Sequence, residues 1–160
     1  DTVFIIGGGG KSGGLCSYEA KRRVGVTGKV IGCCGSTKSA NRLIKLGFCD
    51  EVFVGNAKMP VEIMNKVAEY TNGQMADITI NCVNIPDTEM TSILATKNTG
   101  LVYFFSMATS FTKAALGAEG VGSDVTMMIG NGYTKGHAEI TLQILRDSEK
   151  LREHFTEMYD

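Results

Sequence analysis

Four consecutive glycines follow an apolar segment near the start of the chain, within the stretch FIIGGGGKSGG at residues 4–14. A glycine-rich turn between a strand and a helix is a common phosphate site, because the backbone can approach the ligand and the first helical amides have no partner within the helix. Lys11 and Ser12 follow the fourth glycine, so the segment resembles two kinds of phosphate-binding loop. One binds nucleoside triphosphates and the other binds dinucleotides.

The spacing excludes the triphosphate loop. That loop needs a glycine, four further residues, and then Gly-Lys-Ser or Gly-Lys-Thr. Counting back from Gly10-Lys11-Ser12 places the first glycine at position 5, which is Ile5 within the predicted strand.

The dinucleotide spacing is present in two registers. Gly8, Gly10 and Gly13 fit G-x-G-x-x-G, whereas Gly7, Gly10 and Gly13 fit G-x-x-G-x-x-G. In such a loop the glycines give a tight turn off the strand, room for the pyrophosphate and close helix–strand packing. The motif follows a predicted strand and opens a predicted helix, so we predict a dinucleotide site. The alternative is a tight turn without a ligand.

The end of the second predicted strand, about 20 residues on, is where NAD enzymes usually carry an acid for the adenosine ribose. Residues 33–38 read CCGSTK and contain no carboxylate. A carboxylate at this position would repel the 2′-phosphate of NADP. Without a carboxylate, and with Ser36, Lys38 and Arg42 nearby, the segment has room for a 2′-phosphate. The sequence therefore leaves NAD and NADP both open. Lys38 and Arg42 also fit the solvated face of a helix.

Small and polar residues end the later predicted strands, where open α/β sheets bind their ligands. These segments are NCVN at 81–84, SMA at 106–108 and GNG at 130–132. They fit a ribose and nicotinamide lying over the sheet edge, although GNG is better explained as turn chemistry.

Short β-branched segments alternate with helical patterns along the whole chain. The predicted strands cover residues 2–6, 29–34, 51–54, 77–83, 100–106 and 125–129. The predicted helices cover residues 13–23, 37–48, 60–70, 88–96 and, as one long amphipathic helix, 136–155. The glycine-rich residues 117–124 are predicted to be a loop.

This alternation predicts parallel strands joined by right-handed crossovers. We therefore expect a three-layer α/β Rossmann fold, a doubly wound parallel sheet of six strands in the order 3-2-1-4-5-6.

Composition narrows the classes of partner. The net charge of −1 gives no electrostatic case for nucleic acid or an anionic membrane, and no apolar run approaches the ~18 residues needed to span a bilayer. Five cysteines without a CxxC motif predict a cytoplasmic, reducing location without a disulfide framework. His137 and His154 are far from any cysteine, so we predict no metal site, and we expect His154 to be solvated.

Two stretches resemble the cofactor domain of medium-chain, alcohol-dehydrogenase-like dehydrogenases: VFIIGGGGKSG at 3–13 and GKVIGCCGSTKSANRLIKLGFCDEVF at 28–53. Within that family, ADITINCVN, YFFSMATSFTKAALGAEGVG and IGNGYTKGHAEITLQILR resemble more narrowly an enzyme of bacterial lysine fermentation. The resemblance covers essentially all of the chain. It implies oxidative deamination of a 3,5-diamino acid, with hydride passed to nicotinamide.

The resemblance also assigns positions to the cofactor NAD or NADP. It places the pyrophosphate at Gly8, Gly10, Lys11, Ser12 and Gly13, the adenosine ribose at Cys34, Ser36 and Lys38, and the nicotinamide half at Val83, Asn84, Ser106 and Met107. It assigns no catalytic residue to this chain. Gly8 and Gly14 exceed the glycines that the family usually needs, which suggests a looser loop.

The chain begins at a predicted strand without an initiator methionine, so we expect residues 1–160 to be one domain of a longer protein. The resemblance implies that a GroES-like domain with most contacts to the diamino-acid substrate lies elsewhere. This chain alone should then bind cofactor without turning substrate over. Two alternatives are the cofactor domain of another medium-chain alcohol dehydrogenase or quinone reductase, and a non-catalytic NAD(P)H sensor. The sequence leaves oligomeric state, a homodimer included, open.

Overall fold

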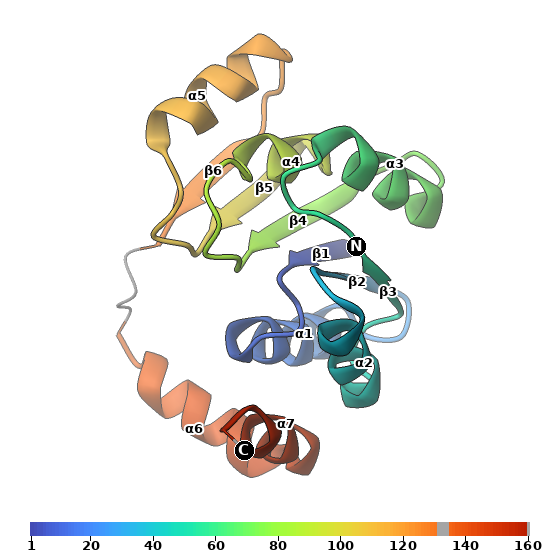
Figure 1. The fold of residues 1–160 in the computed structure, drawn as a ribbon, viewed down its shortest axis with the longest axis vertical. Coiled ribbons are helices and arrows are strands. Elements are labelled where there is room, and N and C mark those ends of the chain that lie inside the picture. The colour runs from blue at the N-terminus through green and yellow to red at the C-terminus, as the bar shows by residue number, and fades with distance from the viewer. Residues whose placement is uncertain (131–134, 160) are drawn as a thin grey trace.

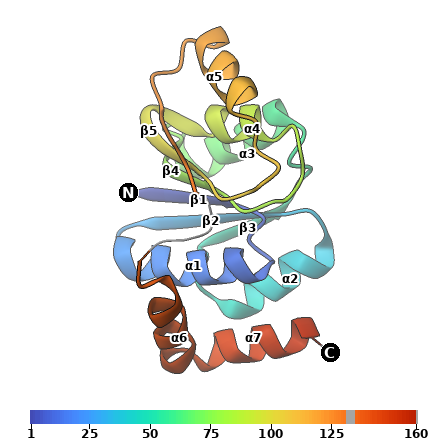
Figure 2. The same ribbon diagram turned by 90° about the vertical axis from the view of Figure 1, so that its left-hand side faces the viewer.

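A six-stranded parallel sheet with helices on both faces forms the computed structural model, which describes residues 1–130 and 135–159 (Figures 1 and 2). Its strands are β1 (Thr2–Ile6), β2 (Lys29–Cys34), β3 (Glu51–Val54), β4 (Ala76–Asn81), β5 (Thr96–Phe104) and β6 (Thr126–Ile129). Its helices are α1 (Lys11–Val24), α2 (Thr37–Leu46), α3 (Pro60–Thr71), α4 (Glu89–Leu94), α5 (Phe111–Gly120), α6 (His137–Asp147) and α7 (Glu149–Tyr159). Among these described helices, none is long and apolar enough to cross a bilayer.

The strand order β3-β2-β1-β4-β5-β6 confirms the predicted topology. β1 pairs with β2 on one side and β4 on the other, so the connections reverse direction between β1 and β4. Loops diverge at such a switch point and leave a crevice outside the carboxyl ends of the strands. The glycine-rich turn after β1 lies at this point.

β1 is apolar without alternation because helices cover both of its faces. Phe4 and Ile6 pack with Phe53 and Ile63 under α3, whereas Ile5 packs with residues of α1 on the opposite face. Figure 2 shows the layers: α3, α4 and α5 on one face of the sheet and α1 and α2 on the other.

The loop prediction for residues 117–124 was wrong in its first half. Helix α5 extends to Gly120, and Ser110 caps its start by accepting a hydrogen bond from the Lys113 amide. A Cβ at Gly117 would lie 2.9 Å from the Met90 Sδ, so a larger residue there would require the methionine side chain to move. The glycine therefore permits close packing of α5 on α4 rather than ending the helix.

The long helix predicted for residues 136–155 is two helices. Ser148 separates them with extended backbone (φ −124°, ψ 106°), and its Oγ accepts a hydrogen bond from the Leu151 amide, which caps α7. The break turns α7 back across α1 and α2, as Figure 2 shows. Consequently His154, predicted to be solvated, is only 3% exposed.

Candidate dinucleotide site

The turn after β1 begins at Gly7, whose φ of +85° lies in the left-handed region that glycine adopts without strain. The amides of Gly7 and Gly8 both donate to the carbonyl oxygen of Cys33, at 2.9 and 3.1 Å. These two bonds bend the chain away from the sheet at the end of β1, as the spacing predicted.

Gly13 lets α1 contact this turn directly. A Cβ at Gly13 would lie 2.3 Å from the Gly7 carbonyl oxygen and 2.5 Å from the Gly8 Cα, so any larger residue would displace the helix. Gly7 makes the turn and Gly13 makes the close contact, which favours the register of Gly7, Gly10 and Gly13.

The amino end of α1 is open to an anion. Gly10 caps the helix without a side-chain hydrogen bond from the described chain, and no acidic residue occupies the first turn. Free amides and the helix dipole together favour a phosphate there. Lys11, predicted to contact the pyrophosphate, has its ammonium 3.6 Å from the centre of the Tyr159 ring and in contact with the Tyr159 hydroxyl.

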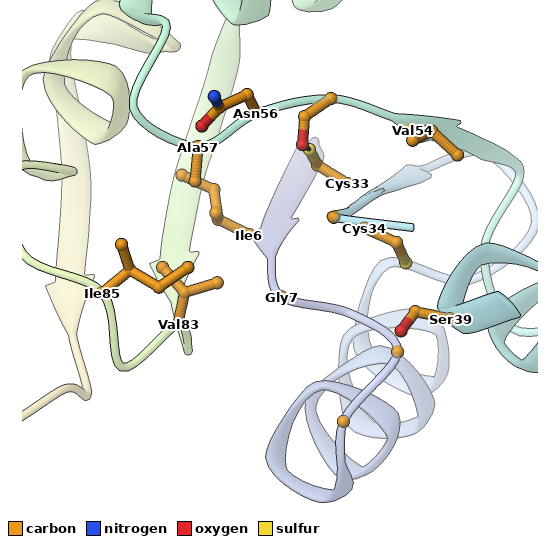
Figure 3. A pocket seen from close by; sticks show the side chains of 14 residues that line it. Ile6, Gly7, Cys33, Cys34, Ser39, Val54, Asn56, Ala57, Val83 and Ile85 are labelled. Atoms are coloured by element: carbon orange, nitrogen blue, oxygen red, sulfur yellow. Dashed lines mark hydrogen bonds between the residues drawn. The ribbon is translucent and has the colours of Figure 1, made fainter. Parts of the chain in front are cut away.

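An open pocket of about 480 Å³ adjoins the turn (Figure 3). Its volume is within the range of small-molecule sites. Val83 and Ile85 lie on one side of it, and Cys34 and Ser39 on the other, with Gly7 between them.

Three of the predicted site residues, Gly10, Cys34 and Val83, line this pocket. The other nine do not: Gly8, Lys11, Ser12, Gly13, Ser36, Lys38, Asn84, Ser106 and Met107. The far wall is formed by the segment from Val54 to Ala57, which was not predicted from the sequence. The rule that ligands lie at the carboxyl ends of parallel strands could have found this segment, because it follows β3.

The end of β2 is a buried cysteine followed by exposed polar residues. Cys34 is 1% exposed, and burial raises the pKa of its thiol, while a hydrogen bond from the Gly9 amide acts in the opposite direction. The Ser36 Oγ accepts from the Ser39 amide at 3.2 Å and caps α2, so its hydroxyl already has a structural role. Lys38 is exposed, and Arg42 donates to the Ser39 Oγ at 3.2 Å.

The segments that follow β4 and β5 lie close together. The Oγ of Ser106 is 3.5 Å from the Oδ1 of Asn84, and Val83 packs against the turn, where a Cβ at Gly7 would lie 2.7 Å from its Cγ1. Met107 is 100% exposed and so packs against no described residue. Of the GNG segment, Asn131 and Gly132 lie outside the described residues.

Asn81 holds the segment after β4 in place. Its Oδ1 accepts from the Val83 amide at 3.1 Å, and its Nδ2 donates to the hydroxyls of Thr88 and Ser92, each at 2.9 Å. Because Asn81 is fully buried, these bonds fix the position of the Val83 wall against the glycine turn.

No His, Cys, Asp or Glu cluster large enough to hold a metal ion occurs in residues 1–130 and 135–159. The site offers the backbone of the glycine turn and of the first turn of α1, residues 7–13, which we call the cradle, next to a mainly apolar pocket.

Two curated proteins match nearly the whole chain. L-erythro-3,5-diaminohexanoate dehydrogenase of Acetoanaerobium sticklandii is 60% identical over 99% of the chain, and the protein of the same name from Fusobacterium nucleatum is 51% identical over 99%. The chain is closely related to the diaminohexanoate dehydrogenases. This confirms the narrower resemblance seen in the sequence. The chain spans 46% of the length of each of these diaminohexanoate dehydrogenases.

Solved structures share the fold at low identity. An alcohol dehydrogenase from Thermotoga maritima has a TM-score of 0.72 and 19% identity, covering 95% of this chain and 41% of its own. The mycobacterial protein Rv1454c, complexed with NADPH, has a TM-score of 0.66 and 17% identity, covering 100% of this chain and 44% of its own. No family model matches the chain. At these identities the likeness establishes the fold alone.

Proposed function

We propose that this chain is the nicotinamide-dinucleotide-binding unit of an oxidoreductase. The observation that carries the proposal is the bend from Gly7 to Gly13, which presents the open first turn of α1 at the switch point between β1 and β4. The open space at Gly10, where a Cβ would meet only the Gly7 carbonyl oxygen at 3.8 Å, supports a pyrophosphate at this bend, and the adjoining pocket of about 480 Å³ supports an adenosine beside it.

The residues of this chain would bind and orient the cofactor. The first turn of α1, from Gly10 to Gly13, would hold the pyrophosphate, with Gly8 beneath it. Cys34, Ser36 and Lys38 would border the adenosine ribose, and the nicotinamide half would lie by Val83, Asn84, Ser106 and Met107. When bound, the nicotinamide supplies the hydride acceptor, and the protein contributes position and exclusion of water.

We further propose that the full-length protein oxidatively deaminates L-erythro-3,5-diaminohexanoate to 5-amino-3-oxohexanoate with release of ammonia. The relationship to the diaminohexanoate dehydrogenases supports this substrate over the alcohols and quinones of the structural neighbours. We place the substrate contacts in a GroES-like domain outside this chain, because the described pocket is accounted for by the cofactor.

Calorimetric titration with NAD+ and NADP+ side by side tests the cofactor site. We expect saturable binding of at least one of them to the full-length protein. If Lys38 contacts a 2′-phosphate, Lys38→Gln should weaken NADP+ roughly tenfold and leave NAD+ unchanged, since a hydrogen bond to a charged group is lost. Lys66→Gln, at an exposed site on α3, is the matched control. Absence of heat with both cofactors would contradict the proposal.

Activity measurements test the division of labour. We expect the full-length protein to reduce NAD+ or NADP+ in the presence of 3,5-diaminohexanoate and not in the presence of simple alcohols. Residues 1–160 expressed alone should give no amine-dependent reduction, because the substrate contacts are absent. Turnover of the diamino acid by residues 1–160 would refute the assignment of substrate binding to another domain.

A further inference from the structure

Helix α7 returns to the phosphate cradle from a distant part of the sequence. The Nε2 of His154 lies 3.3 Å from the carbonyl oxygen of Gly10, the residue that caps α1. That carbonyl also accepts the Gly14 amide at 2.9 Å, within the helix. Two donors therefore converge on the peptide that begins the cradle.

The cradle is shaped to accommodate this histidine. A Cβ at Gly14 would lie 3.1 Å from the His154 Nε2 and 3.2 Å from its Cδ2, which is tighter than ordinary packing. The glycine at position 14, beyond what the motif requires, thus leaves space for the imidazole ring. This is a structural reason for a residue that the sequence alone suggested would loosen the loop.

The surroundings of His154 favour its neutral form. Burial lowers its pKa and the positive charge of Arg42 lowers it further, whereas the hydrogen bond to Gly10 and the charge of Glu157 act in the opposite direction. His154 borders a small surface cavity, whose other charged lining residues include Lys45, Lys150 and Glu153. In the neutral form, the imidazole must carry its proton at Nε2 to donate to the Gly10 carbonyl.

The orientation of this carbonyl determines the direction of an amide. A peptide unit is planar and trans, so the Gly10 carbonyl and the Lys11 N–H point in opposite directions within one plane. The hydrogen bond from His154 holds the Gly10 carbonyl toward α7. The Lys11 N–H of the same peptide then points away from the helix, in the direction from which an anion would bind.

We propose that His154 is a positioning residue of the dinucleotide site, which orients the Gly10–Lys11 peptide so that its amide is held ready for a phosphate oxygen. The inference rests on the proposed function, because it concerns the affinity of the same site. It assigns α7, a helix outside the βαβ motif, a direct part in cofactor binding.

The test compares two substitutions at this position in the full-length protein. His154→Leu removes the donor at similar volume, and His154→Gln restores an amide donor. The probes are NADH, NADPH and adenosine, and the readouts are the Kd of each and the Tm of each variant. We expect the leucine variant to bind the preferred reduced dinucleotide about tenfold more weakly, as for one lost hydrogen bond. Its affinity for adenosine, which has no phosphate, should not change, and the glutamine variant should recover most of the loss.

Val102→Ala is the control for lowered stability. Val102 is fully buried among residues of β5 and α5, away from the cradle, so this variant should lower the Tm without changing the Kd for dinucleotide. Should His154→Leu not fold, His154→Asn makes the same comparison, because its shorter amide does not reach Gly10.

The outcomes separate the two proposals. An unchanged dinucleotide Kd in the leucine variant, or equal losses for dinucleotide and adenosine, overturns the role of His154 while the proposed function stands. If the wild-type protein binds neither NADH nor NADPH, the proposed function fails and the inference fails with it.

Discussion

Replacing Gly10 with valine should strongly weaken dinucleotide binding while the protein stays folded. A Cβ at Gly10 would meet only the Gly7 carbonyl oxygen, at 3.8 Å, so the fold has space for a side chain there. The backbone at Gly10 (φ −85°, ψ −176°) is also one that valine adopts readily. Gly10 lines the pocket, and its added methyl groups would fill the space in which a pyrophosphate must approach the helix amides.

We expect the Kd for the preferred dinucleotide to rise ~100-fold, which corresponds to about 3 kcal/mol of binding free energy. The fold should lose only about 1 kcal/mol, because glycine is a better N-cap than valine. Isothermal titration and urea denaturation of the same sample measure both quantities. Gly120→Val is the matched control, since a Cβ at Gly120 also meets open space but lies at the end of α5. Unaltered affinity in Gly10→Val would mean that the pyrophosphate does not bind at this turn.

The topology was predictable because local patterns and long-range packing agree along most of the chain. Each strand end carries a turn or helix-starting residue, and apolar segments of the right length alternate with amphipathic ones. Parallel strands joined by short connections then leave few arrangements, and the observed order β3-β2-β1-β4-β5-β6 is one of them.

One helix error arose from tertiary packing and the other from a local cap within a periodic apolar pattern. Gly117 looks like a helix breaker, but it lies within α5 because Met90 occupies the space where its side chain would be. Ser148 lies within a periodic apolar pattern, and the helix breaks there because the serine caps α7. The Met90 contact is not visible in the residues next to Gly117, whereas the Ser148 cap is a local signal that the apolar periodicity outweighed in the prediction.

The candidate site also has one part that the sequence predicts and another that depends on tertiary structure. Its glycine turn follows from spacing, because Gly7 has a positive φ and Gly13 makes a close contact with the turn that no larger residue permits. The far wall from Val54 to Ala57 and the contact from His154 depend on which segments fold together. A histidine 144 residues from its partner in the sequence gives no local signal of its role.

Replacing Leu43 with alanine should destabilise the fold and weaken the site together. Leu43 is fully buried on α2. A Cβ added at Gly8 would lie 2.5 Å from the Leu43 Cδ2, and a Cβ added at Gly32 would lie 2.4 Å from it. The leucine therefore fills the space beneath the glycine turn that the absent side chains leave. Its removal opens a cavity against backbone that can relax little, so we expect the free energy of unfolding to fall by about 3–4 kcal/mol.

Ile44 provides the comparison because it is the next residue of the same helix, has the same number of carbon atoms and is 58% exposed. Ile44→Ala should change the free energy of unfolding by less than about 0.5 kcal/mol, as exposed substitutions usually do. Urea denaturation monitored by circular dichroism measures both variants, and titration with dinucleotide at a temperature where both are folded measures the site. We expect Leu43→Ala to bind more weakly than Ile44→Ala, because the turn above the cavity loses its support. Equal stability losses in the two variants would show that α2 does not support the turn through Leu43.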